Sequence, residues 1–252
     1  MGFSSYHNST PNPAERYYRW KGGVKVVETV GPNGQAQQEQ RGGELVFWED
    51  EEQHTTELPF QFCALESTSS VTGYSPTQGR YYSNEVTSSE EPLRIYLDNG
   101  EQRELVASGP YRELKGSLPQ GAKYQMNLYI FNVATQRIER LNLQGSSLSA
   151  WINFGRSNKG IYDHFTVMER GDLAKHGSVE FFPPKFSLGS AYKSLEKSDD
   201  FLQVLTQKDK IIVEYMNGVR DKNSDEPQVE EDAEATPMAS GEEDAPLDVL
   251  PF

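Results

Sequence analysis

The clearest structural signal in this sequence is a set of short apolar runs that alternate like β-strands and are separated by turn residues. Residues 123–133 read KYQMNLYIFNV, and residues 137–143 alternate apolar with polar side chains. Alternation with period two favours strands that bury one face, and turn signals at short spacing favour a sandwich or barrel. The sequence therefore predicts a mainly β fold with a few short helices.

The remaining segments extend this pattern. Further strands are expected over 16–27, 44–48, 58–65, 80–82, 93–97, 161–168 and 178–182. A turn at Gly31-Pro32-Asn33-Gly34 favours a long hairpin between the first two. The Ser/Thr/Gly-rich residues 66–79 are interpreted as a loop. Helices are expected over 111–115, 146–154 and 195–205, and residues 210–216 form either a last strand or a continuation of that last helix.

Charge divides the chain into a body and a tail. The formal net charge is −14, which taken alone argues against a nucleic-acid partner. Residues 221–252, however, hold 11 acidic residues and one basic residue, so this segment carries −10 and the rest only −4. A nearly balanced body is able to carry a local basic groove. We expect three parts: a flexible arm over 1–15, one domain over 16–220, and a disordered acidic tail over 221–252.

The tail ends in apolar residues instead of fading out in polar ones. Its last residues include Asp248, Leu250, Pro251 and Phe252. A partner can bury the terminal ring in an apolar pocket and pair the α-carboxylate with Arg or Lys. This ending resembles the tail of bacterial single-stranded-DNA-binding proteins, although only Asp248 is acidic within the last six residues. The resemblance implies that the tip docks into replication and recombination proteins. The alternative is a solubilising tail with an accidental ending.

In the body, basic residues interleave with aromatic ones, which is what single-strand binding requires: cations for phosphates and flat rings for bases. The candidate DNA-binding residues are Arg19, Trp20, Lys21, Lys25, Tyr74, Arg80, Tyr81, Tyr82, Lys123 and Tyr124. Strand alternation places Tyr18 and Trp20 on one face, and Arg19 and Lys21 on the other. The rings then either stack bases or belong to the core of a β-barrel, and both interpretations stay open.

The body also resembles single-stranded-DNA-binding proteins of tailed bacteriophages, over roughly residues 16–155. The segments that carry the resemblance are RWKGG at 19–23, LPF at 58–60, TGY at 72–74, YSNEV at 82–86 and GSSLSAW at 145–151. It implies an OB-like Greek-key barrel with a groove on one face, and a protein that binds and protects single-stranded DNA without sequence specificity during phage DNA replication or recombination.

Nothing in the sequence indicates catalysis, and we expect neither an enzyme nor a cofactor. His7, His54, His164 and His176 lack metal-ligand spacing with one another or with Cys63, the single cysteine. No phosphate-binding loop or nucleophile elbow is present. One cysteine fits a reducing cytoplasm, that of the bacterial host if the protein is viral. The chain has no apolar run long enough to span a membrane.

Two rival functions remain from the sequence alone. The first is a phage structural or adaptor protein with a β-rich body and no affinity for DNA, which leaves the Pro-Phe ending unexplained. The second is a nucleic-acid enzyme or accessory factor with annealing activity, which differs from a passive binder only in a strand-pairing assay.

Overall fold

The computed structural model describes residues 11–30, 33 and 35–225 of the chain, and its secondary structure is mainly β, as the sequence predicts. The strands are β1 (Tyr17–Lys21), β2 (Lys25–Val30), β3 (Ala36–Arg41), β4 (Glu44–Glu49), β5 (Glu52–Thr56), β6 (Phe60–Ser75), β7 (Gly79–Ser83), β8 (Leu93–Asp98), β9 (Arg103–Gly109), β10 (Ala122–Asn132), β11 (Arg137–Leu143), β12 (His164–Arg170), β13 (Ala174–His176), β14 (Val179–Phe181) and β15 (Pro184–Ala191). The helices are α1 (Tyr111–Leu114), α2 (Ser146–Ser157) and α3 (Ser198–Asp225), with 3-10 turns η1 (Ile161–Asp163) and η2 (Tyr192–Ser194).

One large sheet organises the molecule. Its strands lie in the order β5-β4-β1-β11-β10-β6-β7-β8-β9, and β12 pairs with both β6 and β15. Neighbours are antiparallel except β1 and β11, which run parallel. The long strand β6 links the two parts of the sheet, because its first half pairs with β12 and its second half with β7, while β10 follows it almost throughout.

The largest hydrophobic core, called here the barrel core, receives side chains from β1, β4, β6, β10, β11, β12 and β15. β6, β10 and β11 form an antiparallel meander, α2 follows, and β12 returns to β6 and is joined by β15. The end of β1 meets the residues just before β15, where the Phe182 N–H donates to the Gly22 carbonyl over 2.8 Å. This hydrogen bond joins the end of β1 to the segment before β15. Side chains of α2 pack in the core against these strands, among them Leu148, Trp151 and Ile152.

The second half of β6 corrects the prediction of a loop over 66–79. Residues 66–75 continue the strand, and only the turn after Ser75 leaves it. A loop was predicted because this segment is rich in Ser, Thr and Gly. In the sheet its polar side chains find partners: the Asn127 amide donates to Thr68 Oγ1 at 3.2 Å and to Ser70 Oγ at 3.1 Å. Local composition does not reveal these long-range partners.

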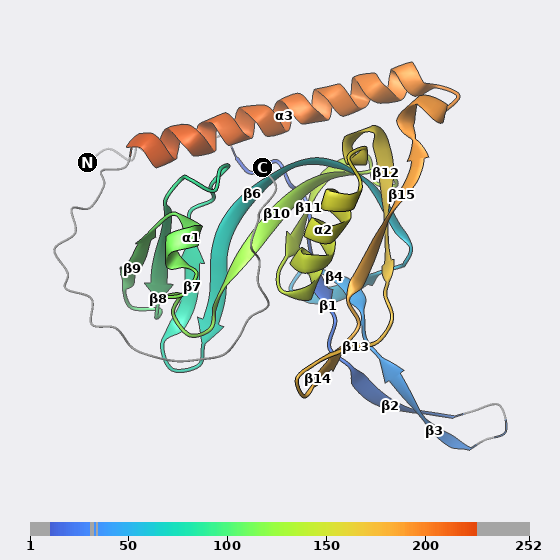
Figure 1. Ribbon diagram of the computed structural model, residues 1–252, viewed down its shortest axis with the longest axis horizontal. Coiled ribbons are helices and arrows are strands. Elements are labelled where there is room, and N and C mark those ends of the chain that lie inside the picture. The colour runs from blue at the N-terminus through green and yellow to red at the C-terminus, as the bar shows by residue number, and fades with distance from the viewer. Residues whose placement is uncertain (1–10, 31–32, 34, 226–252) are drawn as a thin grey trace.

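The helix α3 decides between the two alternatives for residues 210–216 and corrects the start of the tail. It is a single 28-residue helix, so residues 210–216 continue the predicted helix, and it reaches Asp225 instead of giving way to a disordered tail at 221. The residues Leu205, Ile212, Tyr215, Met216 and Val219 recur at helical spacing and pack on the sheet. Together with Cys63, Leu65, Tyr129 and Phe131 they form a second core, called here the α3 core. Figure 1 shows α3 lying along one edge of the whole molecule.

The bounds of the expected arm are corrected, whereas the expected long hairpin is confirmed. Residues 11–15 belong to the body, because Ala14 is buried and the Glu15 N–H donates to the Ile138 carbonyl at 3.0 Å. Residues 1–10 and 226–252 lie outside the described part. The long hairpin joins residues 17–30 to residues 36–49: β1 pairs with β4, and β2 pairs with β3 nearer the predicted turn. The β2–β3 ribbon projects away from the sheet, near β13 and β14 (Figure 1).

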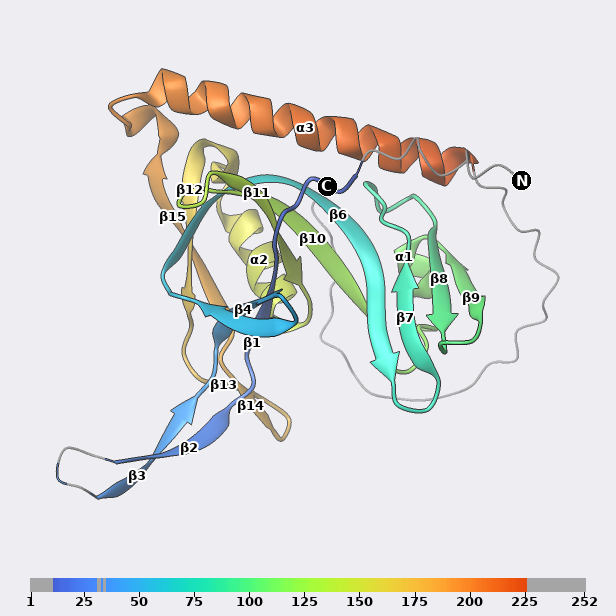
Figure 2. The ribbon, with the colours of Figure 1, turned by 180° about the vertical axis from the view of Figure 1, so that it is seen from behind.

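Strands β7, β8 and β9 extend the sheet beyond the barrel. A third hydrophobic core, called here the extension core, packs against these strands. It contains Val71, Tyr81, Leu93, Ile95 and Leu114 of α1. Both α1 and α2 lie on one side of the sheet, facing the viewer in Figure 1, and Figure 2 shows the sheet from the other side. No helix in the described part of the chain is long and apolar enough to cross a membrane.

Candidate nucleic-acid interface

Three of the predicted DNA-binding rings point into the cores, which corrects their assignment. Trp20 and Tyr124 are buried in the barrel core, and Tyr81 is buried in the extension core. The indole N–H of Trp20 also donates a hydrogen bond to the Phe182 carbonyl at 2.8 Å. A base cannot stack on a ring that the core already covers. These side chains support the fold and are not contact residues, so the barrel-core interpretation holds for this face of β1.

The other face of the sheet collects most of the remaining candidates. We call this side, opposite to the side chains of Tyr18, Trp20 and Tyr124, the outer face. Arg19 and Lys21 alternate with the buried rings of β1, and Lys123 alternates with Tyr124 on β10. Tyr74, Arg80 and Tyr82 lie on the same side of β6 and β7, alternating with residues of the extension core. Six predicted residues therefore share one face.

At one end of the outer face lies the β1–β4 patch, formed by Tyr17, Arg19, Lys21 and Trp48. The register that pairs Tyr18 with Phe47 brings Trp48 beside Tyr17. The two rings are 40% and 48% exposed, enough for a base to reach them. The Lys21 ammonium lies 5.4 Å from the Trp48 ring centroid, and the guanidinium of Arg140 lies 4.5 Å from that of Tyr17. Rings and cations are thus already arranged as pairs.

At the other end lies the β6–β9 patch, formed by Tyr74, Arg80, Tyr82, Tyr96, Arg103 and Lys123. Lys123 of β10 pairs with Thr72 of β6. Thr72 also pairs with Tyr82 of β7, and Tyr82 pairs with Tyr96 of β8. The register therefore carries one row across four strands. Tyr74 is the most exposed large ring of the patch, at 66%.

The cations of both patches are available for a ligand. Among the described residues, Arg19, Lys21, Arg80, Arg103 and Lys123 have no carboxylate within ion-pair distance. Lys21 does donate a hydrogen bond to the side chain of Gln53. Unpaired cations beside exposed rings are the two elements that a single strand requires.

Between the patches runs a band of buried polar side chains. Gln144 donates to Gln125 at 3.0 Å, and Gln125 donates to Asn127 at 2.6 Å. Asn127 then donates to the hydroxyls of Thr68 and Ser70. The amides of Gln144, Gln125 and Asn127 are thus joined in one chain of hydrogen bonds between the two patches.

The band ends at Glu85, which joins the outer face to α3. The Glu85 carboxylate accepts from Thr68 at 2.8 Å, from Tyr129 at 3.1 Å and from Tyr215 of α3 at 3.2 Å. It also pairs with Arg140 at 2.6 Å. Burial opposes the charge on Arg140, but Glu85 outweighs it and the pKa of the guanidinium is raised. Burial and the charge of Glu85 raise the pKa of Tyr129 to about 12, so its hydroxyl remains a donor.

The remaining predicted residues lie elsewhere. Lys25 is on the β2–β3 ribbon, in a separate two-stranded sheet away from both patches. Asp248, Leu250, Pro251 and Phe252 lie outside the described residues. No group of three or more metal-ligating side chains occurs in the described part.

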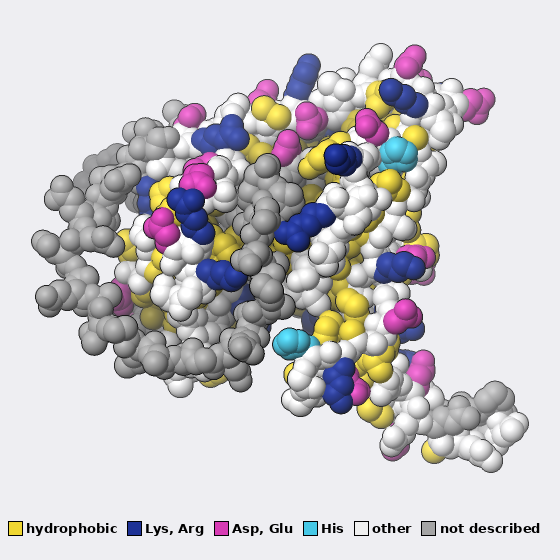
Figure 3. All heavy atoms as spheres, in the orientation of Figure 1, with side chains coloured by type: hydrophobic (Ala, Val, Ile, Leu, Met, Phe, Trp, Pro, Cys, Tyr) yellow, Lys and Arg dark blue, Asp and Glu magenta, His cyan; other side chains and the backbone are white. Residues whose placement is uncertain are grey.

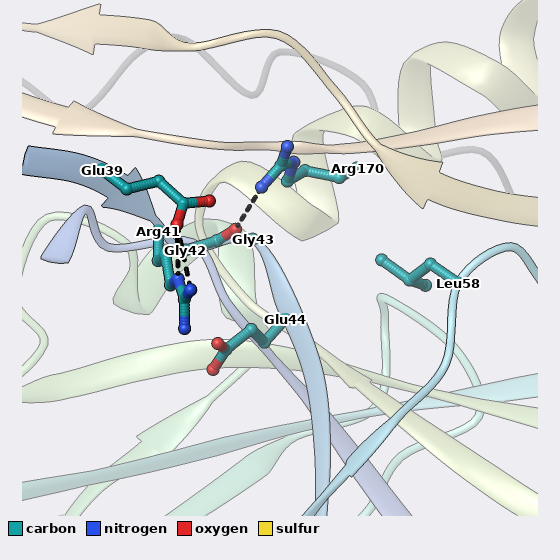
Figure 4. Close-up of a pocket in the computed structure, with 7 residues that line it drawn as sticks. All are labelled: Glu39, Arg41, Gly42, Gly43, Glu44, Leu58 and Arg170. Atoms are coloured by element: carbon teal, nitrogen blue, oxygen red, sulfur yellow. Dashed lines mark hydrogen bonds and ion pairs between the residues drawn. The ribbon is translucent and has the colours of Figure 1, made fainter. Parts of the chain in front are cut away.

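A hollow at the base of the ribbon offers less to an anion than the outer face does. Figure 4 shows Arg41 and Arg170 among its lining residues, together with Glu39, Glu44 and Leu58. Arg41 is paired with Glu39 at 2.9 Å, and Arg170 reaches the Gly42 carbonyl at 3.5 Å. On the face that carries α1 and α2, Lys and Arg are interspersed with Asp and Glu (Figure 3). Neither region matches the outer face.

Five residues of the interface are not among those predicted from the sequence: Tyr17, Trp48, Tyr96, Arg103 and Arg140. Tyr17 belongs to the run RYYRWK, and its alternation with Tyr18 was a usable signal. The other four become neighbours only through pairing between strands. No protein-family model, no curated protein and no solved structure matches this chain.

Proposed function

We propose that the protein binds single-stranded DNA without sequence specificity, as a binding protein of phage DNA replication or recombination and not as an enzyme. One observation carries the proposal: exposed rings and cations without carboxylate partners share the outer face of one sheet. Phosphates bind the cations, and bases stack on the rings at about 1–3 kcal/mol each, whatever their sequence.

The strand order supports the proposal. In an OB-type barrel the face of the second and third strands binds oligonucleotides. Under the proposal, β6, β10 and β11 correspond to the first three strands, α2 to the helix after them, and β12 to the fourth strand, which pairs back to the first. The outer face is then the binding face, and β7–β9 form an insertion between the first and second strands.

The charge distribution favours single strands over duplex. Duplex binding relies mainly on many phosphate contacts, and a body of nearly balanced charge offers few. Exposed rings need bases that are not already stacked and paired, which only a single strand provides. The rings therefore supply selectivity that the net charge of this chain does not.

The acidic tail completes the proposal as the partner-binding element. Asp248, Leu250, Pro251 and Phe252 form its tip, and the preceding acids accelerate encounter with a basic surface. Removing residues 247–252 is expected to leave DNA affinity intact and to abolish capture of replication or recombination proteins from a lysate of the host. Retained capture would place the docking surface in the body.

A fluorescence anisotropy titration of labelled oligo-dT tests the central claim. We expect tight binding, weak competition by duplex DNA, and a plot of log affinity against log salt with a slope of about −0.7 per phosphate contacted. Trp48→Ala is expected to weaken binding roughly 5- to 150-fold, the contribution of one stacked base.

Tyr162→Ala is the matched control, because Tyr162 is 62% exposed on η1, outside the outer face. It should bind like the unaltered protein. Absence of binding by the unaltered protein at low salt would refute the proposal and favour a β-rich adaptor protein.

A further inference from the structure

The strands β7–β9 present two tyrosine rings on the side where the fold does not need them. Tyr82 and Tyr96 are cross-strand neighbours whose centroids lie 5.9 Å apart, with an angle of 28° between the ring planes. The extension core lies on the opposite side of the same strands and is built from Tyr81, Leu93 and Ile95. A half-exposed pair of parallel rings therefore adds little to this core, and such surfaces commonly bind a ligand.

A cation lies over both rings. The guanidinium of Arg103, from β9, lies 3.8 Å from the Tyr96 centroid and 5.2 Å from the Tyr82 centroid. Asp98 faces Arg103 and Arg80 across the strands, yet neither arginine is within ion-pair distance of it. The guanidinium of Arg103 is therefore able to bind a phosphate through its charge and to stack on a base through its flat face.

The position of this pair relative to the β1–β4 patch sets the length of ligand it requires. Five strand spacings separate β1 from β8 along the sheet, which is about 24 Å at ~4.8 Å per strand. The buried amide band lies between them and presents no exposed ring. A strand of only a few nucleotides cannot reach both ends.

Building on the proposed function, we propose that Tyr82, Tyr96 and Arg103 form a second stacking platform. It takes the bases of a single strand that is already seated on the β1–β4 patch, so the insertion β7–β9 lengthens the footprint of the barrel. The ligand is a single-stranded nucleic acid long enough to bridge the two patches.

The test compares two lengths of labelled oligo-dT, about 4 and about 16 nucleotides, the limits of the usual site sizes of such domains. Tyr96→Ala should weaken binding of the long oligonucleotide roughly 5- to 150-fold, one stacked base. It should leave the short one, which the β1–β4 patch still holds, within about twofold. Trp48→Ala should weaken both. Tyr96→Phe should behave like the unaltered protein, because stacking needs the ring and not the hydroxyl.

Arg103→Gln provides a second variant that does not remove a ring from the surface. Arg103→Gln should weaken binding of the long oligonucleotide only. Arg112→Gln, which alters an exposed arginine on α1, should weaken binding of neither oligonucleotide. A Tyr96→Ala protein that folds normally and binds both lengths like the unaltered protein would overturn the inference and leave the proposed function standing. If the unaltered protein binds neither length, the proposed function itself fails.

Discussion

The carboxylate of Glu85 lies 2.6 Å from the guanidinium of Arg140, and through this pair the outer face is joined to α3. Arg140 covers the exposed ring of Tyr17, while the other carboxylate oxygen of Glu85 accepts from Tyr215 of α3. The side chains of Arg140 and Glu85 are 12% and 19% exposed, so water screens this ion pair only weakly. Other ion pairs of the described body, such as Arg16 with Glu49, lie closer to the solvent.

The first prediction concerns this pair. Glu85→Gln leaves the largely buried charge of Arg140 without its counter-ion, and should lower the free energy of unfolding by about 3 kcal/mol. Urea denaturation at neutral pH measures it. The control is Glu49→Gln, whose carboxylate is 55% exposed, with an expected loss below about 1 kcal/mol. Equal losses in the two variants would show that the Glu85 pair has no special weight.

The second prediction concerns phosphate contacts. Arg19 is exposed on the outer face without a carboxylate partner among the described residues, so its charge should pair with one phosphate. Arg19→Gln should therefore make the plot of log affinity against log salt shallower by about 0.7. Lys115→Gln, an exposed lysine directly after α1 on the opposite side of the sheet, should leave the slope unchanged. An unchanged slope for Arg19→Gln as well would remove β1 from the DNA path.

The third prediction uses the single thiol as a reporter of α3. Cys63 is fully buried in the α3 core, and burial raises its pKa to about 11, although the neighbouring Tyr192 acts in the opposite direction. The native thiol should therefore resist an aromatic disulfide reagent, which attacks the thiolate. Leu202→Ala, which loosens the packing of α3, should accelerate labelling at urea concentrations where the sheet is still folded. Rapid labelling of the unaltered protein would contradict the described packing.

Strand alternation could be read from the sequence, but the direction of each face could not. The run at 17–21 separates two rings from two cations, and that separation is confirmed. Whether the rings face a core or a ligand depends on what the other strands supply. Here Trp20 packs with residues of β6, β10 and α2, which come 40 to 130 positions later in the chain.

Cross-strand register explains the other omissions. Tyr96 and Trp48 belong to the interface because of the register in which β7 pairs with β8 and β1 with β4, and a predicted hairpin does not fix that register. The polar half of β6 was misread for the same reason, since the amide of Asn127 that satisfies Thr68 lies 59 positions away. Helical spacing, by contrast, is local, and α2 was correctly predicted.

The last prediction concerns alkaline pH and a buried phenol. Tyr124 lies in the barrel core, with its hydroxyl 2.5 Å from that of Ser69 and its ring centroid 4.1 Å from that of Tyr111. Burial, assisted by Tyr111, raises its pKa to about 12, although the bond with Ser69 acts in the opposite direction. The folded pKa is therefore above the unfolded value near 10.

The sign follows from this difference. Below pH 10 both states keep the proton and stability is complete; between pH 10 and about 12 the unfolded state ionises first, so the folded state loses stability. Two pKa units correspond to a loss of roughly 3 kcal/mol. Tyr124→Phe has no such proton and should show a shallower decline of the free energy of unfolding across this window. Urea denaturation at intervals from pH 9 upward measures both curves, and identical slopes would mean that Tyr124 ionises as easily in the folded protein as in the unfolded chain.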